Sequence, residues 1–235
     1  RLTEYQIMFD KAESDNSRSS ILRFILLNIA KELNLITKNK NVINVIFEEM
    51  DCAGYFLAGD TNNVYLDISY TEKGASINSA ISTYLHECAH LLVHIRDYDC
   101  KHAFLFYAVN LAINIKFDQL LKEVDPDFLY FWTSSSLRMY NIYEDQYETR
   151  ASEIDYEKLS SNLALSTKIA FKYSQNNNKT VNQIIKKICS EYDKKINTDA
   201  LESKKIRKIK NLIVTFLARL YMLCFCFLTI KTIMQ

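Results

Sequence analysis

The segment from Tyr84 to His90 contains the residues whose types and spacing best specify a chemistry: two histidines four positions apart, with a glutamate directly after the first. On an α-helix, side chains four positions apart project from the same face, so His86 and His90 can bind one metal ion. Glu87 can then reach a water molecule held by that ion. This HExxH arrangement is typical of zinc peptidases, and it predicts a Zn2+ site with Glu87 as the catalytic base.

The expected reaction is hydrolysis of a peptide bond in a restricted protein target. Zinc activates the attacking water and polarises the carbonyl, while Glu87 takes a proton and passes it to the leaving amine. A tyrosine or histidine near the site is expected to support the transition state. The candidates for this support are Tyr143, Tyr147, His94 and His102.

Catalytic zinc usually takes three protein ligands, and the motif supplies two. His94 lies one turn further on, too far along a rigid helix to join them. Val93 and Arg96 occupy the glycine and histidine positions of HExxHxxGxxH, which excludes the metzincin pattern. The remaining common solution is a carboxylate from a later helix. The candidates are Glu144, Asp145, Glu148, Glu153, Asp155 and Glu157. For most of these acids, a solvated helix face with internal ion pairs is the alternative interpretation.

The run from His86 to His94, preceded by a short sheet and followed by Glu148-Thr149-Arg150-Ala151-Ser152, resembles the gluzincins. It is most similar to small ImmA/IrrE-type metallopeptidases, in which HExxH precedes an apolar run and a downstream ExxA(N/D) helix. The resemblance covers roughly residues 42–163. It implies His86, His90 and Glu148 as metal ligands and Glu87 as the general base. Ser152 stands where the family usually has Asn or Asp.

The sequence predicts an α+β, mostly helical fold, because only three Gly and one Pro occur and the glycines lie shortly before the motif. Short β-branched or aromatic runs over residues 42–47, 55–58 and 64–68 predict a three-stranded antiparallel or mixed sheet near the N-terminal third. Strand 64–68 is a plausible edge for an extended substrate to pair with. Helices are expected over residues 15 to about 35, 76 to about 96, 101–124, 143–173, and 180 to about 194, with a final helix from about 198.

The motif helix is expected to pack an apolar face on the sheet, while His86 and His90 face a cleft. This apolar face comprises Ile81, Leu85, Cys88, Ala89 and Leu92. The sequence further predicts a metallopeptidase-like domain over residues 1–174 and a helical extension over 175–235, after the polar stretch 175–179. Residues 212–230 are apolar enough to raise the possibility of a membrane anchor, but Arg219 within them favours a buried helix.

The formal net charge is +1, so no nucleic-acid partner is expected. Six scattered cysteines without CxxC spacing favour a reducing, cytoplasmic location. The chain begins at Arg1 rather than Met and can be a fragment or a processed product. The alternative to an active peptidase is an idle, structural or interaction protein, for example one associated with a phage or mobile element, that retains a peptidase fold.

Overall fold

The computed structural model describes residues 2–99, 104–124, 156–175 and 178–199, together with residues 201 and 206. The chain divides into two compact units, Arg1–Cys189 and Ser190–Gln235. The sequence suggested a boundary at 174/175, and its assignment of a peptidase-like domain with a helical extension stays a prediction. Within the second unit, residues 190–199 are helical.

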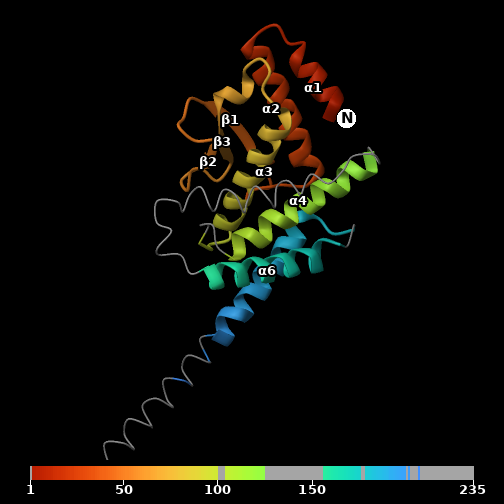
Figure 1. Ribbon diagram of the computed structural model, residues 1–235. Helices are drawn as coiled ribbons and strands as arrows, with labels where there is room; N and C mark the ends of the chain where they lie inside the picture. Colours follow the sequence, from red (N-terminus) through yellow and green to blue (C-terminus); the bar gives the residue numbers. More distant parts are fainter. Residues whose placement is uncertain are drawn as a thin grey trace, which may run out of the picture. The chain divides into compact units, whose positions relative to one another are not determined.

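The first unit is mostly helical with one small sheet, which confirms the predicted α+β fold (Figure 1). In chain order its elements are α1 (Leu2–Asp10), α2 (Asp15–Glu32), β1 (Asn44–Glu48), β2 (Gly54–Phe56), β3 (Asn63–Asp67), the 3-10 helix η1 (Ile68–Thr71), α3 (Ile77–His94), α4 (Phe104–Val124) and α6 (Tyr156–Ser174). Residues 181–189 are also helical. The HExxH motif lies on α3, as the sequence predicted.

The sheet is mixed, with strand order β1-β3-β2. β1 runs parallel to β3, and β2 runs antiparallel to β3. The prediction that strand 64–68 forms an edge is therefore wrong: β3 is hydrogen-bonded to a neighbour on both sides. The edge strand that contacts α3 is β2.

The sheet turns one face toward the helices because its residues alternate in burial. On this inner face, Val45 of β1 and Val64 and Leu66 of β3 are all fully buried. The neighbouring residues of β3 point to the other face and are only half-buried, as the two-residue period of a strand requires. α2 contacts the sheet at β1, and α3 contacts it at β2 and β3.

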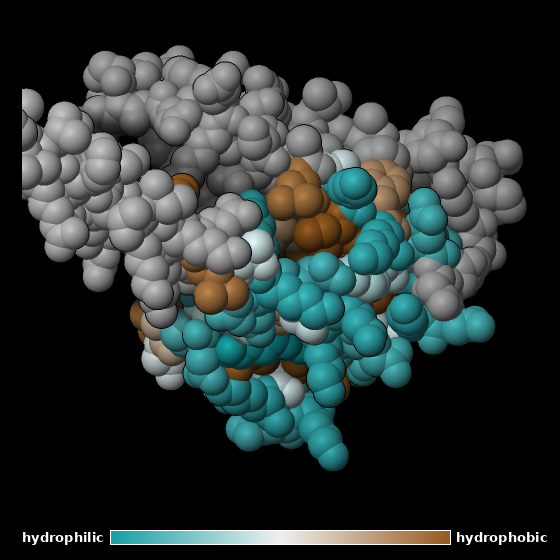
Figure 2. Space-filling view, turned by 90° about the horizontal axis from the view of Figure 1, so that it is seen from below, coloured by the Kyte–Doolittle hydropathy of each residue, from teal (hydrophilic) through white to brown (hydrophobic). Residues whose placement is uncertain are grey.

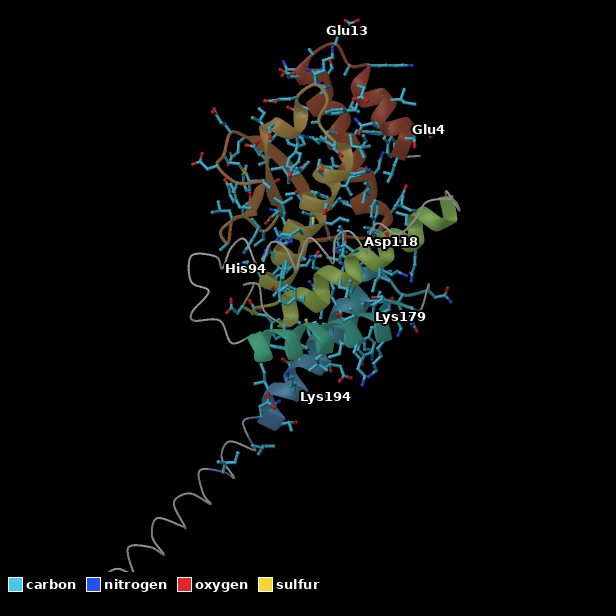
Figure 3. All side chains as sticks on the ribbon, in the orientation of Figure 1. Glu4, Glu13, His94, Asp118, Lys179 and Lys194 are labelled. Atoms are coloured by element: carbon cyan, nitrogen blue, oxygen red, sulfur yellow. The ribbon has the colours of Figure 1, made fainter. Side chains whose placement is uncertain are left out.

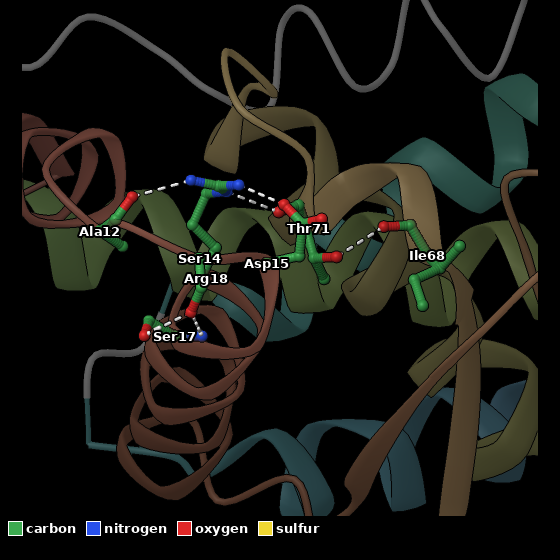
Figure 4. A network of polar contacts seen from close by, with 7 residues as sticks. All are labelled: Ala12, Ser14, Asp15, Ser17, Arg18, Ile68 and Thr71. Carbon is green, nitrogen blue, oxygen red and sulfur yellow. Dashed lines mark hydrogen bonds and ion pairs between the residues drawn. The ribbon is translucent and has the colours of Figure 1, made fainter.

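Arg18 fixes the start of α2 to the segment that follows the sheet. Ser14 caps this helix by accepting a hydrogen bond from the Ser17 amide at 3.2 Å. The buried Arg18 guanidinium donates to the Ala12 carbonyl at 2.8 Å and to the Thr71 carbonyl at 2.9 Å, and it forms an ion pair with Asp15 (Figure 4). This network joins the α1–α2 connection to η1, so α2 and β3 are held in one framework.

α4 contacts α3 and α6. Toward α6, the Ser166 hydroxyl donates to the Phe104 carbonyl at 2.9 Å, and the Gln119 amide donates to the Ser174 carbonyl at 3.0 Å. Most of α4 is buried, including Phe106 and Phe117. The helix is therefore part of the core, which explains its largely apolar sequence.

The predicted break between two helices near residues 194–198 is wrong, because residues 191–199 are helical throughout. The Thr198 hydroxyl donates to the Lys194 carbonyl at 2.9 Å, one turn earlier. Thr198 therefore occupies a helix interior, where a threonine side chain can bond back to the preceding turn, and does not cap a new helix.

In the described ranges, no helix combines the length and apolarity needed to cross a membrane. Residues 212–230, which raised that question, lie outside those ranges. The view from below shows a mainly hydrophilic described surface with small apolar patches (Figure 2). The large apolar side chains that are exposed are scattered along the chain: Ile7, Met8, Phe24, Leu57, Ile68, Ile196, Leu201 and Ile206.

Candidate metal centre

The two motif histidines lie side by side on α3. The Ser76 side chain caps this helix by accepting from the Ser79 amide at 3.4 Å, and no Gly or Pro interrupts residues 77–94. The helix therefore carries His86 and His90 with regular four-residue spacing, and their Nε2 atoms are 3.2 Å apart. Both histidines direct the same ring nitrogen to one point.

This separation suits two ligands of one zinc ion. Imidazole nitrogens bind zinc at about 2.0–2.1 Å in near-tetrahedral geometry, which places two of them about 3.3 Å apart. The distance of 3.2 Å between the Nε2 atoms of His86 and His90 agrees with that value. The pair thus fits two of the three protein ligands that a catalytic zinc requires.

Two phenyl rings enclose His90. The Phe106 ring of α4 stacks on it with centroids 4.0 Å apart at 19°, and the Phe56 ring of β2 stacks at 5.8 Å and 13°. Phe106 also meets His86 edge-on at 4.9 Å. We expected the histidines to face a cleft; in the structure His86 is half-buried, and His90 is buried, with 8% exposure, and is held by aromatic contacts from two elements. These contacts restrict its ring orientation.

Glu87 is buried beside the histidines, with 6% of its surface exposed. Burial raises the pKa of its carboxyl group from the ordinary value to about 8, because a low-dielectric environment disfavours the charged form. A cation held by the neighbouring histidines would act in the opposite direction and favour the carboxylate. Glu87 therefore has a dry environment on the helix that carries both histidines.

Gly54 allows β2 to lie directly on α3 at Glu87. A Cβ at this position would lie 2.8 Å from Thr83 Cγ2, 2.9 Å from the Tyr65 carbonyl oxygen and 3.3 Å from Glu87 Cγ. The first two distances are shorter than real Cβ contacts, so only glycine permits this approach. Thr83 is itself fixed by a 2.8 Å hydrogen bond to the Tyr70 hydroxyl.

The opposite side of α3 is anchored in the core. The five residues of the predicted apolar face are all fully buried. The buried Tyr84 hydroxyl donates to the Ile43 carbonyl at 2.5 Å and so ties α3 to the start of β1. Cys88, inside the motif, is also fully buried, and burial raises the pKa of its thiol well above the ordinary value. Cys88 is therefore part of the packed core of the helix.

His94 lies in the last turn of α3 (Figure 3). Its Nε2 is 3.0 Å from the Ala58 carbonyl oxygen, and its ring is tilted against Phe56 at 5.4 Å. His94 therefore links the segment after β2 to the helix end. Of the other residues predicted to complete the site, Glu157 lies in the first turn of α6. The rest lie outside the described ranges: Glu144, Asp145, Glu148, Glu153, Asp155, Tyr143, Tyr147 and His102. Within those ranges, no three His, Cys, Asp or Glu side chains form a group that could hold a metal ion.

A surface pocket elsewhere in the first unit is separate from these residues. It is lined by Leu33 after α2, by Lys116 and Gln119 of α4, and by Lys179 and Thr180, among others. Lys179 and His94 are both labelled in Figure 3. None of the motif residues lines this pocket, so it contributes nothing to the candidate metal centre.

Sequence reasoning missed three residues that shape the centre: Gly54, Phe56 and Phe106. A glycine inside a short aromatic run often marks a close backbone approach, so Gly54 carried a usable signal. Phe56 adjoins it in the same run. Phe106 is one of many apolar residues in α4, and the helical period does not reveal that it meets the histidines.

Comparison with known proteins finds no matching family model, and no curated protein or solved structure is significantly similar to the chain. The geometry of the centre and the HExxH motif are therefore what indicates a function for this chain.

Proposed function

We propose that the chain is a zinc-dependent, gluzincin-like peptidase, similar to the ImmA/IrrE type, that hydrolyses peptide bonds in a restricted protein target in the cytoplasm. The supporting observation is the pair of Nε2 atoms 3.2 Å apart on α3, with the buried Glu87 directly after His86 in the same helix. When bound, a zinc ion supplies Lewis-acid polarisation of the peptide carbonyl and lowers the pKa of a water molecule.

The protein side chains have distinct roles in this proposal. His86 and His90 hold the ion through Nε2, and the rings of Phe56 and Phe106 keep His90 in its orientation. Glu87 accepts the proton of the attacking water on a carboxylate oxygen and delivers it to the leaving amine. Its burial limits exchange of that proton with bulk water.

The third ligand proposed is Glu148, with Glu144 and Glu153 as the alternatives, and Tyr143 and Tyr147 are proposed to support the transition state. His94 was a third candidate for that support. Its Nε2 lies 3.0 Å from the Ala58 carbonyl oxygen. We therefore propose that the main role of His94 is to hold the segment after β2 in place.

The substrate strand is proposed to pair with the outer edge of β2, in place of strand 64–68. The Asp67 amide donates to the Ala53 carbonyl at 3.1 Å, so residues 53 and 67 form a hydrogen-bonded pair of the antiparallel ladder. Such pairs alternate, and the peptide groups of Gly54 and Phe56 therefore point away from β3. The Gly54 carbonyl has a weak contact with Cys52 Sγ at 3.5 Å, which a peptide N–H would displace. A segment paired there would run beside Glu87 and His90.

Metal analysis and one substitution test this proposal. The purified full chain is expected to bind about one zinc ion, and His86→Ala or His90→Ala should lower its zinc affinity strongly because each removes a ligand. Glu87→Gln should keep the metal and reduce hydrolysis of a labelled unfolded protein by at least about 100-fold. Glu49→Gln, which alters an exposed carboxylate next to β1, is the matched control.

Two results would contradict the proposal. One is a chain that binds no zinc at neutral pH. The other is hydrolytic activity that survives Glu87→Gln while the Glu49→Gln control behaves as the unmodified protein. Glu148→Gln, compared with Glu144→Gln and Glu153→Gln, separately identifies the third ligand through the loss of zinc affinity.

A further inference from the structure

The outer face of the sheet carries a pair of stacked tyrosine rings beside the edge of β2 that pairs with no described strand. Tyr55 of β2 and Tyr65 of β3 are register partners, and their rings are parallel within 6° at 4.8 Å. The Tyr55 hydroxyl is hydrogen-bonded to the Glu48 carboxylate, and the Tyr65 hydroxyl donates to Asp60 Oδ2 at 2.9 Å. Both rings are thus fixed by carboxylates, with Tyr55 nearer the edge.

This part of the chain is uniformly acidic. Residues 41–72 contain six carboxylates and no Lys, Arg or His, although the whole chain has a net charge of +1. The six are Glu48, Glu49, Asp51, Asp60, Asp67 and Glu72. The ion pairs found among the described residues, Arg18 with Asp15 and Lys38 with Asp97, involve none of them. Within the part of the chain that the structure describes, these carboxylates around the sheet therefore form no ion pair with a cation.

A strand added at the edge of β2 would bring a side chain next to Tyr55. Neighbouring residues in register point to the same face of a sheet, and strands lie about 4.8 Å apart. The residue opposite Tyr55 would therefore extend the row formed by Tyr65 and Tyr55. Its side chain would lie on the remaining face of the Tyr55 ring, whose hydroxyl is hydrogen-bonded across β3 to the Glu48 carboxylate of β1. An arginine or lysine fits this position, because its charge complements the carboxylate and its cation can lie over the ring.

We propose that this outer face selects an extended protein segment with a basic residue opposite Tyr55, and that Tyr55 and Glu48 determine this specificity. The inference rests on the proposed pairing of a substrate with β2 and names the substrate class: an extended segment with arginine or lysine at the position opposite Tyr55. The Glu48 carboxylate accepts a hydrogen bond from the Tyr55 hydroxyl, and this hydrogen bond raises the pKa of Tyr55 to about 12.

Peptide binding to the full chain carrying Glu87→Gln, with zinc removed by a chelator, tests this inference without hydrolysis. The probe is a seven-residue peptide in which arginine alternates with threonine. Its partner has citrulline, a neutral arginine analogue, at the same positions. Fluorescence polarisation is expected to show about tenfold tighter binding of the arginine peptide, decreasing with added salt.

Substitutions on the sheet localise the effect. Tyr55→Leu should remove most of the preference for arginine over citrulline and leave citrulline-peptide binding nearly unchanged, since the main-chain edge is kept. Glu48→Gln should reduce the preference severalfold. Asp97→Asn removes an exposed acid paired with Lys38 outside this face and should change nothing. Circular dichroism checks that each variant is folded.

Equal binding of the two peptides would overturn the inference, as would full retention of the preference in folded Tyr55→Leu and Glu48→Gln. A preference for arginine in a chain that fails the zinc and hydrolysis tests would leave this surface standing and end the peptidase proposal. Normal hydrolysis without the preference for arginine would end this inference and leave the peptidase proposal standing.

Discussion

The two strands that flank β3 differ in what they contribute. β1 pairs with β3 over five residue pairs, its Val45 is fully buried, and the Ile43 carbonyl just before it accepts the Tyr84 hydroxyl. β2 pairs over three residues, none of them fully buried, and it brings Gly54 and Phe56 to the candidate metal centre. β1 therefore contributes to the core, and β2 positions residues at the candidate metal centre. Substitutions on the two flanks should therefore separate stability from metal binding.

The largest effect on stability is expected in β3, the strand that pairs with both β1 and β2. Leu66→Ala removes a fully buried side chain of β3 and should lower the free energy of unfolding by about 2–5 kcal/mol. Urea unfolding measures this change. Leu57→Ala, at a position that is 51% exposed, is the control and should change stability little. Equal losses for the two variants would contradict the assignment of the core to this face.

Gly54→Ala, in β2, should have the second largest effect after Leu66→Ala. Its Cβ would meet Thr83 Cγ2 at 2.8 Å and the Tyr65 carbonyl at 2.9 Å, and overpacking of this kind costs about 1–3 kcal/mol. Displacement of β2 from Glu87 should also lower hydrolysis per folded molecule. Gly59→Ala is a matched control, because a Cβ there meets nothing within 4 Å. If both substitutions proved equally mild, the close contact between β2 and α3 would be refuted.

Phe56→Leu should weaken metal binding more than it weakens the fold. Leucine keeps the apolar contact but loses the planar ring that stacks on His90, so zinc affinity should fall roughly tenfold, as for other supporting residues around metal ligands. Competition with a chromophoric chelator measures the affinity. Phe24→Leu, at a position that is 55% exposed on α2, serves as the control. An unchanged zinc affinity would show that the stacking on His90 has no influence on the metal.

Tyr84→Phe should produce the smallest effect. In contrast to Phe56→Leu, it should lower the stability of the fold and leave zinc affinity unchanged. It removes the hydrogen bond to the Ile43 carbonyl beside β1 and should cost about 1 kcal/mol of stability. Thermal and urea unfolding report this loss, while zinc affinity should match that of the unmodified chain. A fall in zinc affinity similar to that of Phe56→Leu would mean that the two flanks are not separable.

The sequence predicted the fold class and the location of the motif because both follow from local signals. Helix α3 has a capping serine, an uninterrupted run and a clear apolar face, and each of these can be identified within about 20 residues. The three strands were recognised from β-branched and aromatic runs between turn residues. Their existence was therefore predictable.

Strand order was not predictable in the same way. Whether β3 or β2 forms the edge depends on pairing between residues far apart in the chain, and β3 has apolar residues that suit either position. The contact of Phe106 with His90 is likewise non-local, since it depends on how α4 packs on α3. The identity of the third ligand stays a prediction, because Glu148 lies outside the described residues.

Gly54 also has an evolutionary consequence. Thr83 could be replaced by a smaller residue to make room for a side chain at position 54, but the Tyr65 oxygen belongs to the main chain and no substitution can remove it. Compensating mutations elsewhere therefore cannot make room for a side chain at position 54. Relatives that keep β2 against the motif helix should retain glycine here even where the surrounding strand residues have diverged.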